Sequence, residues 1–148
     1  MRGYAAIGLD NPKTPANVGS AIRAAQVYGA AMIALRGPRF KRWPTDTMAG
    51  WKHFPLLECD NLYDVIPFSC IPVAIELLEV AEPLPEYRHP ERAFYIFGAE
   101  DATLGERVLS WCKDRVFVPT KGCMNLAATV NVVLYDRMVK CRIKEREK

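Results

Sequence analysis

The chain has 148 residues, of which half are hydrophobic and a quarter are charged, and its formal net charge at pH 7 is +3. This profile is typical of one globular domain (residues 1–148) with enough residues to form a hydrophobic core, rather than of a disordered or fibrous chain. No apolar run reaches the roughly 18 residues of a membrane span, and the N-terminal stretch lacks the apolar segment of a secretory signal, so we expect a cytoplasmic protein.

The first half of the chain begins with a short apolar strand and a helix. We predict a strand over 4–10, ended by an Asp-Asn-Pro turn, and a helix over 17–28, stopped by Gly29. A second buried strand is predicted over 31–37, followed by a loop rich in Arg, Lys and aromatic residues. A short strand within 51–59 and a short helix within 61–68 complete this half.

The second half alternates strands with helices in the same way. We predict strands over 71–77, 92–98 and 114–120, a proline-rich loop over 81–91, a helix over 104–112 and a long final helix over 124–144. The strands are apolar on both faces, which is typical of a parallel sheet with helices on both sides, an α/β fold.

Ligands of such folds bind beyond the carboxyl ends of the strands. Three loops at these ends, 10–17, 98–105 and 119–124, are therefore the candidate site. The glycine patterns of dinucleotide-binding and P-loop proteins do not follow any strand, which argues against those two classes.

The chain has five cysteines, an odd number that cannot pair completely, and no CxxC motif, so we expect reduced thiols. The two histidines lie at no ligand-like spacing from the cysteines, and we expect no metal.

The positive charge is concentrated in two segments, 36–53 and 137–148. Basic clusters on a mildly acidic body favour contact with a polyanion such as RNA. Within the first cluster, Arg39, Lys41 and Arg42 could grip phosphates and Trp43 could stack on a base. The alternative is an ordinary basic loop with one packing tryptophan.

Three motifs occur at these loops in one order. The first is Asn17-Val-Gly19 with Arg23 four residues later; the second is the strand end Phe-Gly98-Ala-Glu100; the third is Val118-Pro119, a short loop, and then Cys123-Met124-Asn125 opening a helix. Together they resemble the SPOUT superfamily of RNA methyltransferases, in its TrmH-like 2′-O-ribose branch. The chain departs from the family pattern at Cys123, commonly Ser, and at Thr103, commonly Gly.

The resemblance implies a fold and an assembly that the residues alone do not. It implies a deep C-terminal trefoil knot, which general rules of chain topology would argue against, and a homodimer built on the first and last helices. The chain looks most like the short, single-domain members that methylate the wobble nucleotide of transfer RNA.

The resemblance also implies roles for individual residues. S-adenosylmethionine would bind in a pocket lined by Ile75, Gly98, Val118, Cys123 and Met124, and at Gly98 a Cβ would intrude on the ligand. The catalytic set would be Arg23, Asn17, Glu100 and Asn125.

Each of these residues also has a structural interpretation. Asn17 and Asn125 could be helix caps, Glu100 a surface carboxylate, Ile75 and Val118 core residues, and Arg23 a solvated arginine.

For Arg23 we expect a specific chemical task. Arginine is a poor general base because its pKa lies above about 12. We therefore expect it to stabilise developing alkoxide charge on the ribose oxygen and to hold a phosphate, with Gly19 and Ser20 leaving a bare helix face for the RNA.

Three other functions stay open at this point. They are methylation of ribosomal RNA, methylation of a base nitrogen by an enzyme of the same fold, and RNA binding by a non-catalytic dimer. Intact Arg23, Glu100 and Asn125 argue against the last of these.

Overall fold

The computed structural model describes residues 3–38, 49–76 and 80–147. Seven strands form one sheet in the order β3-β2-β1-β6-β4-β7-β5, and every neighbouring pair is parallel. The strands are β1 (Tyr4–Asp10), β2 (Met32–Arg36), β3 (Leu56–Cys59), β4 (Ile71–Ile75), β5 (Glu82–Pro83), β6 (Arg92–Phe97) and β7 (Asp114–Phe117). The predicted α/β class with a parallel sheet is confirmed.

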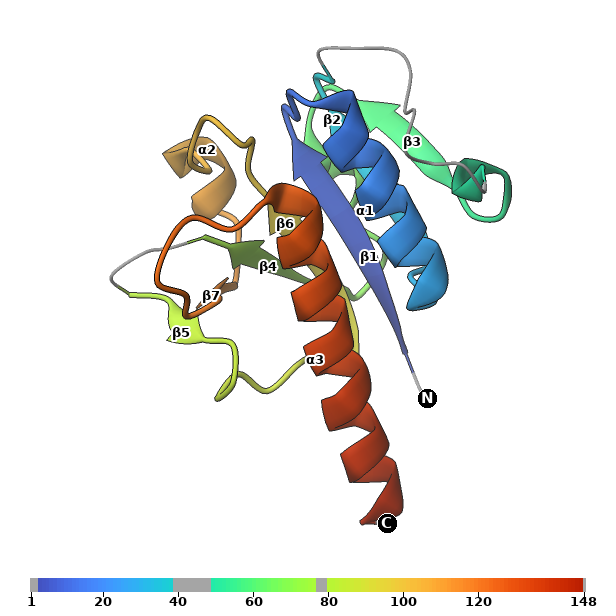
Figure 1. Cartoon of the computed structure of the whole chain (residues 1–148), viewed down its shortest axis with the longest axis vertical. Coiled ribbons are helices and arrows are strands. Elements are labelled where there is room, and N and C mark those ends of the chain that lie inside the picture. Colours follow the sequence, from blue (N-terminus) through green and yellow to red (C-terminus); the bar gives the residue numbers. More distant parts are fainter. Residues whose placement is uncertain (1–2, 39–48, 77–79, 148) are drawn as a thin grey trace.

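Helices and short helical turns cover the two faces of this sheet. They are α1 (Pro15–Val27), the 3₁₀ turns η1 (Gly50–Lys52) and η2 (Leu62–Val65), α2 (Glu106–Leu109) and α3 (Leu126–Arg146). Helices α1 and α3 pack side by side on one face, as Figure 1 shows. The buried side chains of the other face pack with Leu62 of η2 and with Val108 and Leu109 of α2. The sheet is therefore buried on both sides, which explains why its strands are apolar on both faces.

Four elements differ from the sequence prediction. Helix α1 begins two residues early, at Pro15, because proline is preorganised for the first turn of a helix. Helix α2 has four residues instead of nine. It stops where the Ser110 hydroxyl and the Arg115 guanidinium donate to the carbonyls of Arg107 and Leu109.

The other two differences lie at β5 and α3. The two-residue strand β5 lies inside the predicted proline-rich loop, at the sheet edge, where proline is tolerated because one side of the strand needs no partner. Helix α3 begins at Leu126, after its cap Asn125, and runs to Arg146, past the predicted end at 144.

The register of the sheet brings the candidate loops together. Leu9 of β1 and Ile75 of β4 both pair with Phe97 of β6, and Ile75 also pairs with Val116 of β7. Because the strands are parallel and end at the same level, the loops that follow them share one edge of the sheet. The N-terminus of α3 follows the last of these loops.

No helix in the described part of the chain is long and apolar enough to cross a membrane. The trefoil knot and the single-domain organisation stay predictions.

Candidate active site

A cavity of about 720 Å³ opens at the carboxyl edge of the sheet. Its walls come from the ends of β4, β6 and β7, the loops that follow them, and the first turn of α3. All five residues predicted to bind a cofactor line it: Ile75, Gly98, Val118, Cys123 and Met124. Ile75 is buried, whereas the thiol-bearing Cys123 is exposed at the rim and forms no disulfide.

Glu100, from the loop after β6, binds the beginning of α1. Its carboxylate accepts hydrogen bonds from the backbone N–H groups of Lys13 (3.0 Å) and Thr14 (3.1 Å) and from the side-chain amide of Asn17 (2.7 Å). Thr14 is the N-cap residue of α1, but its own side chain makes no capping bond. Glu100 therefore supplies, from another loop, the negative charge and the acceptors that a helix N-terminus needs.

These contacts set the protonation state of Glu100. Burial alone would raise the pKa of this carboxyl group, but the hydrogen bonds from the Asn17 amide and from the backbone outweigh it. The pKa of Glu100 therefore lies below its ordinary value, and the group is a carboxylate at neutral pH.

Asn125 connects the third motif to the first. Its amide nitrogen donates to Asn17 Oδ1 at 2.7 Å, while its own Oδ1 accepts from the N–H groups of Ala127 and Ala128. Asn125 is thus the N-cap of α3, as the structural interpretation proposed, and at the same time bonds to Asn17. Glu100, Asn17 and Asn125 form one chain of hydrogen bonds, the motif network, that joins the N-termini of α1 and α3.

The interpretation of Asn17 as a helix cap is wrong. Helix α1 begins at Pro15, so Asn17 lies in its first turn, where its side chain turns to Glu100 and Asn125. Sequence reasoning placed the helix start at Asn17 because it took the preceding proline as a break rather than as a first-turn residue.

Arg23 is exposed on α1, six residues past Asn17, and is not among the residues that line the cavity. The structure partly corrects the expectation of a bare face beside it: Gly19 is buried and Ser20 is half-buried. The surface next to Arg23 that RNA could approach is therefore narrower than predicted.

The predicted RNA-binding residues Arg39, Lys41 and Arg42, with Trp43, lie outside the described residues. Among the described residues no group of three or more His, Cys, Asp or Glu side chains could hold a metal ion.

Glu76 was missed by sequence reasoning. It follows β4 directly, lines the cavity and accepts a hydrogen bond from Leu104 N at 2.7 Å. The available signal was its position, because an acidic residue at the carboxyl end of a parallel strand points to the ligand edge.

Gly98 lies beside this contact. A Cβ there would meet Ala102 O and Leu104 N at 3.3 Å and Glu76 Oε2 at 3.5 Å. A Cβ at this position would therefore crowd the cavity's own wall, and the expected clash with a bound ligand stays a prediction.

Comparison with known proteins gives consistent results. The chain is 27% identical over 142 residues to the 23S rRNA (guanosine-2′-O-)-methyltransferase RlmB of Acinetobacter baylyi, covering 88% of this chain and 57% of that protein. It also resembles the SpoU methyltransferase AviRb of Streptomyces viridochromogenes, solved with AdoMet, with a TM-score of 0.82, 19% identity and coverage of 97% and 62% of the two chains.

A third relative matches over nearly its whole length. This structure, from work on the 2-OH methylation of C/U34 on tRNA, has a TM-score of 0.78, 23% identity and coverage of 96% of this chain and 93% of that one. The chain thus spans less than two thirds of the first two relatives but nearly all of this one.

The sequence pattern of the SpoU rRNA Methylase family matches residues 4–135. This range holds all three motifs, the motif network and the cavity. The chain belongs to the SpoU rRNA Methylase family.

Proposed function

We propose that the protein is an S-adenosylmethionine-dependent RNA 2′-O-ribose methyltransferase that acts on the wobble nucleotide of transfer RNA. One observation carries this: the motif network of Glu100, Asn17 and Asn125 lies at a cavity lined by all five residues predicted to bind the cofactor. Family membership and this geometry point to the same edge of the sheet.

The cavity has the size and composition of a nucleoside-binding site. Its volume of about 720 Å³ falls within the range usual for small-molecule sites. Apolar side chains such as Ile75 and Val118 offer surface for an adenine ring, and the loops after β6 and β7 offer backbone groups. S-adenosylmethionine bound there would supply a methyl group activated by its sulfonium.

The residues around the cavity would orient the RNA. Transfer would break the bond between the methyl group and the sulfonium sulfur, leaving a neutral thioether, and form a bond to ribose O2′, whose proton would pass to solvent water. Partial negative charge would develop on this oxygen during the step. Arg23 on α1 would stabilise that charge and hold the neighbouring phosphate with its planar donor fork. The motif network would hold α1, and hence Arg23, at a fixed position relative to the N-terminus of α3.

Transfer RNA is the favoured substrate because the relative of matching length was studied for methylation of C/U34 on tRNA. Ribosomal RNA is the second candidate, since RlmB is named for 23S rRNA. Mapping 2′-O-methyl groups in both RNA classes from cells with and without the gene separates the two. Loss of a wobble-position methyl supports the proposal, and loss of a ribosomal methyl supports the alternative.

We also propose a homodimer formed through α1 and α3. These two helices share one face of the sheet and carry exposed apolar side chains, among them Val27, Val132 and Tyr135. The cytoplasmic location stays a prediction.

The direct test of function uses Arg23. Arg23→Ala should abolish methyl transfer to transfer RNA that lacks the modification, while the affinity for S-adenosylhomocysteine stays near that of the wild type. Arg23→Lys should also fail largely, since an ammonium group cannot reproduce the planar fork. Tritiated methyl incorporation measures methyl transfer, and calorimetry measures the affinity for S-adenosylhomocysteine. An Arg23→Ala protein with wild-type turnover would show that Arg23 has no part in the mechanism.

A further inference from the structure

Glu76 brings a carboxylate into the cavity at the carboxyl end of β4. Its backbone N–H donates to Val116 O at 2.9 Å, which continues the pairing with β7 one residue past the strand. This pairing fixes where the side chain leaves the sheet. The side chain is half-buried and lines the cavity together with Ile75 and Gly98.

One oxygen of this carboxylate already has a partner. Glu76 Oε2 accepts from Leu104 N at 2.7 Å, so the 98–105 loop holds the side chain in place. Two carboxylate oxygens offer about four acceptor positions, and the Leu104 N–H uses one of them. The remaining positions suit a ligand with hydroxyl or amine donors.

We infer that Glu76 binds the ribose hydroxyls of the nucleoside that occupies this cavity. The inference rests on the proposed function, which places S-adenosylmethionine there. An acidic side chain near the carboxyl edge of a parallel sheet recognises ribose hydroxyls in other nucleotide-binding α/β folds, because a carboxylate accepts from both hydroxyls of a vicinal diol. The neighbouring Ile75 would then pack on the adenine, which places the sugar next to Glu76.

The variant that tests this is Glu76→Gln. Glutamine keeps an oxygen that can accept from Leu104 N, so the loop and the thermal unfolding midpoint should be unchanged, but it removes the charge that strengthens hydrogen bonds to hydroxyls. We expect its affinity for S-adenosylhomocysteine to fall about tenfold, as for the loss of a charge-assisted hydrogen bond. Glu106→Gln is the matched control, because it makes the same charge change on an exposed residue of α2 outside the cavity lining.

Two further probes assign the contact to the ribose. The wild type should bind the 2′-deoxy and 3′-deoxy forms of S-adenosylhomocysteine more weakly than the parent, and Glu76→Gln should lose most of this discrimination. S-adenosylmethionine should lose the same factor as S-adenosylhomocysteine, because both carry the same ribose and differ at sulfur. Calorimetric titration measures all four ligands.

Several results would overturn the inference. They are unchanged affinity of Glu76→Gln for S-adenosylhomocysteine, undiminished discrimination against the deoxy forms, and a loss confined to S-adenosylmethionine, which would place the carboxylate at the sulfonium. A wild-type protein that binds neither ligand would overturn the proposed function, and this inference with it. If the wild type binds the ligands and Glu76→Gln binds them equally well, the inference about Glu76 is overturned and the proposed function is not.

Discussion

Asn17 is the residue at which the three motifs meet. Its amide nitrogen donates to Glu100 and its oxygen accepts from Asn125, so it needs a donor and an acceptor on one short side chain. This explains why asparagine, rather than aspartate or serine, stands in the first turn of α1.

Asn17→Asp should therefore disrupt the motif network, although it replaces only the side-chain NH2 group by an oxygen. The new carboxylate cannot donate to Glu100 and places a like charge beside it, so we expect a loss of about 1–3 kcal/mol in the free energy of unfolding and at least a tenfold loss of methyl transfer. Asn61→Asp is the control, since Asn61 Oδ1 accepts from Tyr63 N and an aspartate can do the same. Denaturant unfolding and methyl incorporation measure both variants; equal behaviour of the two would show that the motif network contributes nothing.

Gly98 gives a second prediction at this scale. Gly98→Val should weaken S-adenosylhomocysteine binding at least tenfold, because its side chain meets Ala102 O and Leu104 N and pushes the loop and Glu76 out of place. Gly105→Ala is the matched control, since a Cβ at Gly105 meets nothing within 4 Å and its φ of −74° suits any residue. Calorimetric titration measures the affinity of both variants for S-adenosylhomocysteine. Wild-type affinity in Gly98→Val would show that the 98–105 loop can accommodate the larger side chain without loss of binding.

The sequence could predict which residues gather here, but not how they bond. Motif spacing and the parallel sheet were enough to bring Asn17, Glu100 and Asn125 to one edge. The sequence did not reveal that Glu100 binds the N-terminus of α1, because a contact made by a loop more than 80 residues away leaves no local sequence pattern. Glu76 was missed for a similar reason, since its partner Leu104 lies on a different loop.

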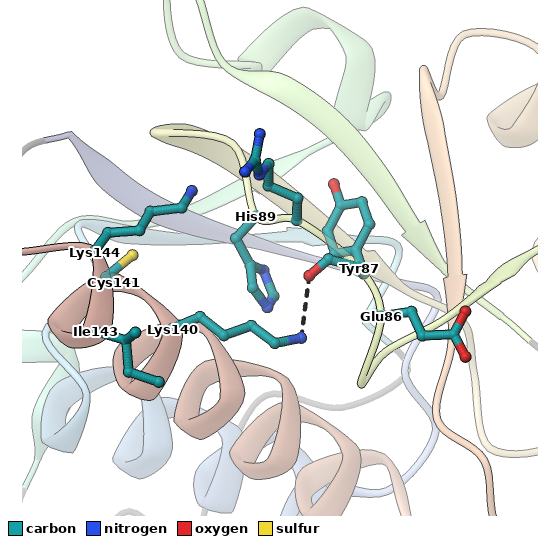
Figure 2. Close-up of a pocket in the computed structure, with 8 residues that line it drawn as sticks. Glu86, Tyr87, His89, Lys140, Cys141, Ile143 and Lys144 are labelled. Atoms are coloured by element: carbon teal, nitrogen blue, oxygen red, sulfur yellow. Dashed lines mark hydrogen bonds between the residues drawn. The ribbon is translucent and has the colours of Figure 1, made fainter. Parts of the chain in front are cut away.

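At the scale of elements, α3 is fixed to the segment 84–91 by side-chain hydrogen bonds. The Lys140 ammonium donates to Leu84 O and Tyr87 O, and the Arg137 guanidinium to Pro90 O and Glu91 O. Figure 2 shows Lys140 reaching Tyr87 across a hollow of about 240 Å³, at the opposite end of α3 from the proposed active site. Part of the predicted basic tail thus holds the helix to the body.

The buried imidazole of His89 belongs to the same contact. Its Nε2 lies 2.8 Å from Asp136 Oδ2 and its Nδ1 lies 2.6 Å from the Tyr95 hydroxyl. Burial lowers the pKa of His89 to about 4, although Asp136 acts in the opposite direction. His89 is therefore neutral in the folded protein near pH 6.

This shift predicts an acid-sensitive fold. In the unfolded chain His89 takes up a proton near its ordinary pKa of 6.5, whereas in the folded protein it is protonated only near pH 4. The free energy of unfolding should fall as the pH drops from 6.5 to 4, by up to about 3 kcal/mol from this group. Urea unfolding at several pH values measures it.

The two histidines of the chain provide the comparison. His89→Gln should flatten the dependence between pH 6.5 and 4, whatever its stability at neutral pH, and the same substitution at the exposed His53 is the control. Identical slopes in both variants would rule out His89 as the source. Carboxylates such as Glu100 titrate in all three proteins, so they cancel in the comparison.

Element prediction succeeded where the chemistry of the chain is local. Strands β1, β2, β4, β6 and β7 were found because their apolar runs end at turn residues, and α3 because its apolar positions continue for several turns. Prediction failed at two short elements: α2 is shorter than predicted because it ends through bonds made by Ser110 and Arg115, and β5 was not predicted because it depends on pairing with β7. Tertiary contacts of this kind override local preference.

At the scale of the whole molecule, the outer surface of α1 and α3 carries exposed apolar side chains. Val27 is 69% exposed and Tyr135 55%, and Val132 lies one turn before Tyr135 on the same face of α3. Helices α1 and α3 lie side by side (Figure 1), and the rings of Tyr28, just after α1, and Tyr135 of α3 meet edge to face with centroids 6.5 Å apart. A second copy of the chain is the partner that we propose for this surface.

A charge on this surface should then separate the subunits. Tyr135→Glu would bury a carboxylate without a partner in the proposed interface, a cost of several kcal/mol, so we expect a monomeric mass by light scattering at micromolar concentration, where the wild type gives twice that mass. Phe68→Glu is the control: Phe68 is 90% exposed and belongs to neither helix, so the same kind of change there should leave a dimer. A monomeric wild type, or a Tyr135→Glu protein that is still dimeric, would refute assembly through this face, whereas a monomer that keeps its circular dichroism and loses methyl transfer would show that the active site depends on the second copy.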